Sequence, residues 1–160
     1  MKNEQGFSLV ELLIVVAIIA IIAAIAVPSL LTSRMAANEA SGIEGCRTAG
    51  SSMVAYAAVN NQNYTDIAGL VGEAYLDDRF TNASGFNGYI YTDAATVAGL
   101  PTGVGVGTPT EFGVQADPVT SLARYTYAIG PDQVVRYQGY QAPATADPVG
   151  LSAGDPIGKR

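Results

Sequence analysis

The order of hydrophobic and polar positions divides the start of the chain into clear segments. Residues 1–6 are mostly polar, and residues 7–27 form an apolar run in which Glu11 is the only charged side chain and Ser8 the only other polar one. At ~1.5 Å per helical residue this run is about 31 Å long, which matches a hydrocarbon core of roughly 30 Å. The pattern predicts a membrane-spanning helix that carries one carboxylate near its beginning.

Beyond Pro28 the pattern becomes amphipathic. Apolar residues recur at steps of three and four, which places them on one face of a helix; they are Ile43, Cys46, Ala49 or Gly50, Met53 and Ala57. One helix from Ser8 to Val59 would be about 78 Å long, far beyond the globular mean. We therefore expect a projecting hydrophobic half and an amphipathic half that packs on a sheet.

The rest of the chain predicts a small α+β head. Asn60-Asn61-Gln62-Asn63 ends the helix, and a short helix over residues 65–71 and a turn near Tyr75-Leu76 follow. Strand patterns occupy residues 89–92, 111–116, 124–129 and 133–137, with Gly130-Pro131-Asp132 as a hairpin connection. This predicts an antiparallel sheet of about four strands, with an exposed loop at residues 98–110 and a flexible tail at residues 141–160.

Composition argues against catalysis and against nucleic acid as a primary partner. The chain has 8 Lys and Arg, 14 Asp and Glu, and no histidine, which removes the usual neutral-pH acid/base group and the commonest metal ligand. No nucleophile and base pair is visible, so we expect no enzyme, no catalytic residue and no cofactor. Asp77-Asp78, Asp147 and Asp155 lack the regular spacing of a calcium loop, so we expect no metal site.

The cysteine content excludes a fold that is held together by intramolecular disulfides. Cys46 is the only cysteine, so it cannot form an intramolecular disulfide. We expect it to be a small buried apolar residue.

Three interpretations of the N-terminal run remain to be compared. An ordinary secretory signal would be cleaved after Ala24-Ile25-Ala26, but the run is longer than a signal core of ~7–15 residues and Lys2 is offset by Glu4. A plain membrane anchor fits the length of the run but gives no reason for Glu11. A carboxylate in hydrocarbon has a high cost in free energy, so by default it is interpreted as functional. Near the helix start, the helix dipole would also favour that anion.

The third interpretation accounts for Glu11. Gly6-Phe7-Ser8-Leu9-Val10-Glu11-Leu12-Leu13, followed by an Ile/Val/Ala run and Pro28, closely resembles the N-terminus of type IV pilins and type II secretion pseudopilins. The resemblance implies the pilin fold, cleavage between Gly6 and Phe7 by a prepilin peptidase, and N-methylation of Phe7 by the same enzyme. Lipid would hold the precursor before assembly, and identical or related subunits and an inner-membrane assembly platform would be its partners.

The resemblance also implies a layout and a function. Residues 1–6 would be the leader, 7–28 the transmembrane and filament-core helix, 29–59 the amphipathic half, 60–140 the head and 141–160 the tail. The chain would be a structural subunit of a type IV pilus-like filament that serves adhesion, motility or DNA uptake. The alternatives are a major pseudopilin of type II secretion and a membrane-anchored or secreted binding protein that never polymerises. The precursor would lie in the bacterial inner membrane, and the assembled form in a surface pilus or periplasmic pseudopilus.

Two further residues have expected roles in assembly. Glu11 lies one helical turn above the amine that cleavage would create at Phe7, and by resemblance it would pair with the amine of a neighbouring subunit and set the register. Pro28 removes one backbone donor and crowds the carbonyl of Ala24, which predicts a kink or a local loosening. By resemblance to related filaments, this segment would either keep a fixed kink or lose helical order on assembly. The small residues between Ala36 and Gly50 predict a tight helix-on-sheet contact, a crowded filament core, or both on different faces.

Overall fold

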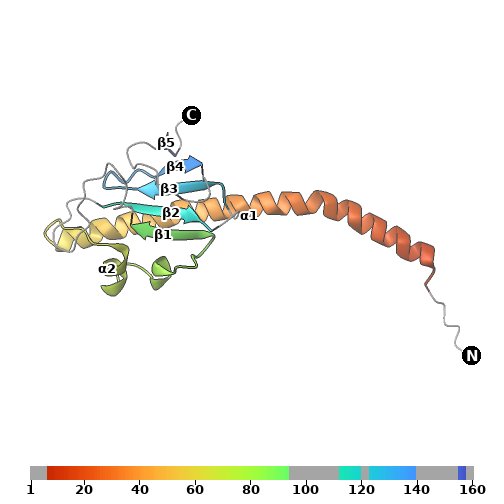
Figure 1. The fold of residues 1–160 in the computed structure, drawn as a ribbon, viewed down its shortest axis with the longest axis horizontal. Coiled ribbons are helices and arrows are strands. Elements are labelled where there is room, and N and C mark those ends of the chain that lie inside the picture. Colours follow the sequence, from red (N-terminus) through yellow and green to blue (C-terminus); the bar gives the residue numbers. More distant parts are fainter. Residues whose placement is uncertain (1–6, 94–111, 120–122, 140–154, 158–160) are drawn as a thin grey trace, which may run out of the picture. The chain divides into compact units, whose positions relative to one another are not determined.

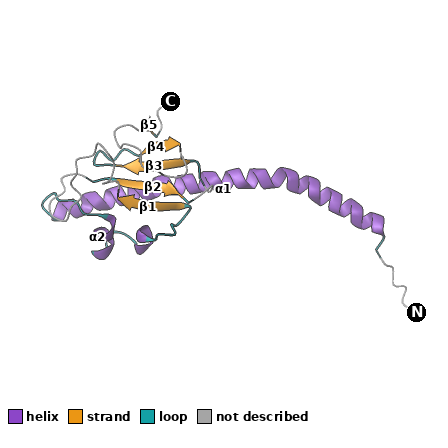
Figure 2. Cartoon of the chain, in the orientation of Figure 1, coloured by secondary structure: helices purple, strands orange, loops and turns teal. Residues whose placement is uncertain are grey.

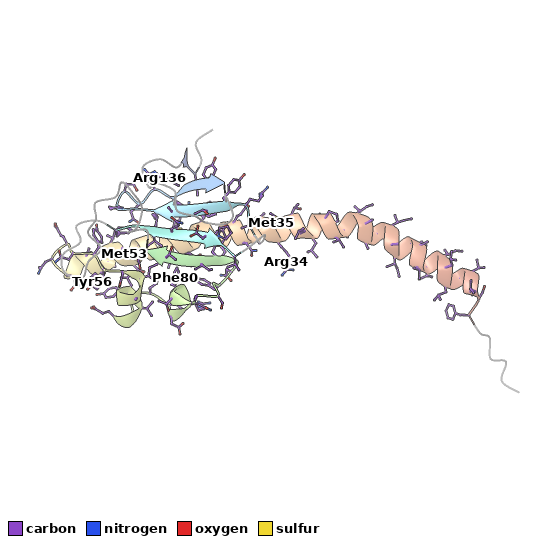
Figure 3. The ribbon with its side chains drawn as sticks, viewed as in Figure 1. Arg34, Met35, Met53, Tyr56, Phe80 and Arg136 are labelled. Atoms are coloured by element: carbon purple, nitrogen blue, oxygen red, sulfur yellow. The ribbon has the colours of Figure 1, made fainter. Side chains whose placement is uncertain are left out.

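The computed structural model describes residues 7–93, 112–119, 123–139 and 155–157. The chain divides into two compact units, Met1–Arg34 and Met35–Arg160, and each is described by itself. The helix α1 (Leu9–Val59, 51 residues) contributes to both of them, and Arg34 and Met35, labelled in Figure 3, mark the boundary along it.

The first unit consists of the apolar half of α1. Every residue from 7 to 34 is exposed, and the side chain of Phe7 is 88% exposed. By length and composition, α1 is the one helix among the described residues that is long and apolar enough to cross a membrane. The helix continues through Pro28. Figure 1 draws α1 as one unbroken helix.

The second unit is built on an antiparallel sheet, which confirms the expected α+β class (Figure 2). Its strands are β1 (Tyr89–Asp93), β2 (Val114–Pro118), β3 (Tyr125–Ile129), β4 (Arg136–Gly139) and β5 (Asp155–Pro156). They are ordered β1-β2-β3-β4-β5, and all neighbours are antiparallel. The sequence predicted about four strands at nearly these positions and did not predict β5, whose two residues are too few to give a strand pattern.

Several predicted boundaries shift. The fourth strand begins at Arg136 rather than at residue 133, because Gln133 has a positive φ of 57° in the turn after Gly130. Only residues 155–157 of the expected tail are described. There Asp155 pairs with Tyr137, and the Ile157 N–H donates to Val135 O at 3.1 Å. The predicted loop at residues 98–110 lies outside the described residues.

Two short helices connect α1 to the sheet. The first, α2 (Ile67–Gly72), begins where the Asp66 carboxylate accepts the Gly69 N–H at 2.6 Å. The second is a 3-10 helix, η1 (Asp78–Thr81), which begins where Asp77 accepts the Arg79 N–H at 2.9 Å. Aspartate caps of this kind satisfy backbone donors that the first turn leaves free. The sequence predicted the first helix nearly at its observed position and a turn near Tyr75-Leu76, where the chain does turn between the two helices, but it did not predict η1.

The core lies where one face of α1 meets β1, β2 and β3. Figure 3 labels Met53 of α1 and Phe80 of η1, which are both buried in it. The fully buried or nearly buried partners from the sheet share the face that contacts α1; they are Tyr89, Tyr91, Val114, Ala116, Tyr127 and Ile129. The amphipathic pattern of residues 43–57 therefore predicted the buried face of the helix.

Glycines allow the sheet to approach this face closely. A Cβ at Gly42 would lie 2.8 Å from the ring of Tyr89, and one at Gly45 would lie 2.5 Å from Cζ of Tyr91. The Tyr91 hydroxyl donates to the backbone carbonyl of Ser41 at 3.4 Å. The glycines, which a helix disfavours by about 1 kcal/mol each against alanine, are thus compensated by the aromatic rings that fill their place.

We predict that Gly45→Ala destabilises the head by about 1–3 kcal/mol, the usual cost of overpacking. The ring of Tyr91 cannot easily give way, because it packs against Phe80 and Phe86 at centroid distances of 4.8 and 5.1 Å. The measurement is urea unfolding of the full chain in detergent. Gly72→Ala is the matched control, since a Cβ there meets nothing within 4 Å. A Gly45→Ala chain as stable as the control would contradict the close-approach account.

We predict that Cys46 reacts with thiol reagents only after the head unfolds. Cys46 is fully buried in the core, as the sequence predicted, and burial raises the pKa of its thiol to about 12, so the reactive thiolate is scarce at pH 8. The measurement is the rate of alkylation in native buffer and in denaturant. Equal rates in the two conditions would contradict this placement.

Candidate processing and assembly site

The candidate site lies at the start of α1. Phe7 and Ser8 precede the helix, which begins at Leu9, and both are exposed. Gly6, the residue before the expected cleavage, lies outside the described residues. The structure therefore places Phe7 and Glu11 at the exposed beginning of the helix.

The side chains of Ser8 and Glu11 each accept a backbone N–H at the start of the helix. The Ser8 N–H donates to Oε2 of Glu11 at 2.9 Å, and the Val10 N–H donates to Oγ of Ser8 at 3.3 Å. The Leu12 N–H donates to the Ser8 carbonyl at 3.2 Å, which is the first bond of the helix. This arrangement is similar to a capping box, although the serine hydroxyl accepts the N–H two residues on rather than three, and it satisfies backbone donors at the helix start.

The capping role of Ser8 was missed in the sequence analysis, although its signal was present. A serine followed three residues later by glutamate, ahead of an apolar run, is the sequence signature of a capping box. Glu11 was interpreted only as a charge within an apolar run, and Ser8 was not paired with it. Glu11 thus has a local structural role at the start of α1.

Pro28 lies in a stretch where other side chains also engage the helix backbone. Proline has no N–H to donate to the carbonyl of Ala24. Downstream, Oγ1 of Thr32 and Oγ of Ser33 each donate to the carbonyl of Ser29 at 2.9 Å. Such bonds compete with the backbone ladder and often bend a helix. The sequence analysis identified Pro28 but not these two hydroxyl groups.

Of the carboxylates considered as calcium ligands, Asp77 forms an ion pair with a neighbouring arginine. Asp77 binds the guanidinium of Arg79, with Oδ1 2.8 Å from Nε, and this contact lowers the pKa of Asp77 to about 2. Asp155 lies in β5, and Asp147 is outside the described residues. Among the described residues, no group of three or more His, Cys, Asp or Glu side chains is placed to hold a metal ion.

A comparison with protein-family models gives a match at the N-terminus of the chain. Residues 1–27 match the family model described as the prokaryotic N-terminal methylation motif. A search of curated proteins found no match to the chain. The match covers Gly6, Phe7, Glu11 and the apolar run, which carried most of the resemblance in the sequence, and it ends one residue before Pro28.

The motif has general consequences for processing and location. It implies processing by a prepilin peptidase and polymerisation of the kind that pilins undergo, and it is typical of structural subunits rather than of an enzyme family. The apolar part of α1, which begins inside the motif, is consistent with anchoring in a membrane. Residues 1–27 therefore carry the class III leader and N-terminal methylation motif of type IV pilins and pseudopilins.

Proposed function

We propose that the chain is the precursor of a structural subunit of a type IV pilus-like filament. In this proposal the precursor is stored in the bacterial inner membrane, cleaved between Gly6 and Phe7, methylated on Phe7 and polymerised through α1. The observation that carries the proposal is the match at residues 1–27 together with a helix half on which every residue from 7 to 34 is exposed. The work of such a subunit is mechanical, without catalysis, cofactor or metal.

Burial of the apolar side chains on the exposed half of α1 would be strongly favourable. Sixteen large apolar side chains between Phe7 and Leu31 are exposed, and full burial of each contributes about 1.5–3 kcal/mol. Their sum exceeds the ~4–15 kcal/mol lost when a free molecule associates. Either a bilayer or the apolar helices of other copies would provide the burial. The proposal uses the bilayer for the stored precursor and other copies for the filament.

Transfer from lipid to filament needs a further driving force. Lipid tails are as apolar as leucine, so helices gain little from the hydrophobic effect when they leave a bilayer for one another. Charge pairing differs, because opposite charges attract far more strongly in a low-dielectric interior than in water. We propose that Glu11 pairs with the methylated amine of Phe7 in a neighbouring subunit. A misplaced neighbour would leave a buried carboxylate unpaired, so this contact would fix the register.

The same N-terminal features suit a major pseudopilin, which is the alternative from the closest functional class. A surface filament that contains this chain supports the pilus proposal. Loss of protein export on deletion of the chain, without surface filaments, would instead assign it to a periplasmic pseudopilus. A chain that forms no filament of either kind would be a membrane-anchored or secreted binding protein.

We predict that the chain isolated from membranes begins at Phe7 and carries one methyl group on its amine. Intact mass and N-terminal sequencing measure both features. Gly6→Leu should leave an uncleaved precursor, because a side chain at this position would clash in an extended protease cleft. A chain that begins at Val27 would show ordinary secretion instead, and an intact Met1 would show a plain anchor.

We predict that Glu11→Val leaves processing and membrane insertion intact but reduces the fraction of chain in sheared filaments by an order of magnitude or more, since it removes a buried charge partner. Glu11→Gln separates the two roles of the residue. Its amide oxygen can still accept the Ser8 N–H, but it has no charge for the amine. Both variants should fail to assemble, whereas Ser8→Ala, which weakens only the cap, should still assemble.

The outcome with Glu11→Gln decides between the explanations. If Glu11→Gln assembled normally while Glu11→Val did not, the capping bond rather than the ion pair would be the cause. If both assembled normally, Glu11 would have no role in register.

A further inference from the structure

Two short stretches of the chain match the acceptor pattern for carbohydrate on asparagine, which is Asn, any residue except proline, and Ser or Thr. They are Asn63-Tyr64-Thr65, between α1 and α2, and Asn82-Ala83-Ser84, which follows η1. The pattern is short and arises by chance, so a second observation must separate an acceptor from a coincidence. Burial and packing differ between the two stretches.

The first stretch is held against the head by its side chains. All three of its residues are partly buried. The ring of Tyr64 packs against the ring of Phe112 in the core, with 4.8 Å between the ring centroids. Oγ1 of Thr65 lies over the first turn of α2, in the space that a Cβ at Gly69 would need. An enzyme could reach Asn63 in the folded head only after these contacts were broken.

The second stretch lies on the surface of the head. Residues 81–84 are all exposed, between Phe80, which is buried, and Phe86, which is partly buried. The rings of Phe80 and Phe86 contact each other at a centroid distance of 5.0 Å. The two rings therefore fix both ends of the segment, while the residues between them stay outside the core.

Local bonds hold Asn82 and Ser84 together in one turn. The Ser84 N–H donates to Oδ1 of Asn82 at 2.9 Å, and the Gly85 N–H donates to the Asn82 carbonyl at 2.8 Å. Gly85 has a positive φ of 72° and lies against β1, where a Cβ would be 2.5 Å from the Tyr89 carbonyl oxygen. The two turn bonds join residues within three positions of one another, so the segment can open into an enzyme's cleft without loss of core contacts.

We propose that Asn82 is the acceptor of an N-linked oligosaccharide and that Asn63 is not. The donor is an oligosaccharide carried on a lipid diphosphate, and a transferase in the membrane joins the two. Nδ2 of Asn82 forms a bond to C1 of the first sugar as the bond between C1 and the diphosphate oxygen breaks. The lipid diphosphate leaves with that electron pair, and Nδ2 loses one proton to a base of the transferase. Nothing is oxidised or reduced.

The composition gives a physical reason for a hydrophilic addition to the head. Charged residues make up 14% of the chain, well below the roughly 25% of typical globular domains. An oligosaccharide on an exposed turn adds many hydrated hydroxyl groups to such a surface without disturbing the core. The inference rests on the proposed function in one respect, since the head must lie outside the cytoplasm, and it needs no filament.

Mass spectrometry of tryptic peptides tests this inference on the full chain purified from the membranes of its own cells. Trypsin cuts after Arg47, Arg79 and Arg124, so Asn63 and Asn82 lie on separate peptides, 48–79 and 80–124. Peptide 80–124 should carry a mass gain equal to a whole number of sugar residues, and peptide 48–79 should have its unmodified mass.

Matched variants assign the mass gain to the amide nitrogen. Asn82→Asp should lose the gain, because its carboxylate can accept the Ser84 N–H and keep the turn but has no amide nitrogen. Ser84→Ala should also lose it, since this variant keeps the backbone N–H but lacks the hydroxyl of the acceptor pattern. Asn63→Asp is the control and should keep the gain.

Three results would each overturn the inference: an unmodified Asn82 in the natural chain, a gain that survives Asn82→Asp, and a sugar on Asn63. The same sample reports the N-terminus of the chain. A chain that begins at methylated Phe7 and has an unmodified Asn82 would contradict this inference alone and leave the proposed function in place.

Discussion

The first half of α1 exposes large apolar side chains, for which water is a poor solvent. The need to bury this surface is the constraint on which the rest of the account depends. Residues 7–34 are exposed along the whole helix, so the chain needs an apolar environment that it does not provide for itself. A bilayer and the helices of other copies meet that need almost equally well. We propose that polar groups decide between the two environments, and among residues 7–34, which the structure describes, Glu11 is the carboxylate that could do so.

In the second half of α1, small residues allow the sheet to approach the helix closely. Gly42, Gly45 and Gly50 face the sheet, where Tyr89, Tyr91 and Ile129 occupy the space that a Cβ would need. The tight helix-on-sheet contact expected from the small residues is thus present. The alanines at positions 36, 37 and 40 are exposed, so a crowded contact between copies on that other face stays a prediction.

The sequence predicted much of the fold because periodicity and turn residues are local signals. It anticipated a helix ending at Val59, its buried face and four of the five strands. It did not predict β5 or the contact between Glu39 and Arg124, because both depend on residues brought together only by the folded chain. The capping bond of Ser8 was different, since its local signature was present and overlooked.

The central claim is that the apolar half of α1 is buried by other copies of the chain. Electron cryomicroscopy of filaments sheared or extracted from cells that express the chain tests it most directly. The account predicts filaments in which residues 7–27 of many copies pack around the axis, with each Glu11 carboxylate within ion-pair distance of a neighbouring Phe7 amine. Filaments whose apolar helices lie outside the core, or a chain found only as single subunits in the membrane, would contradict it.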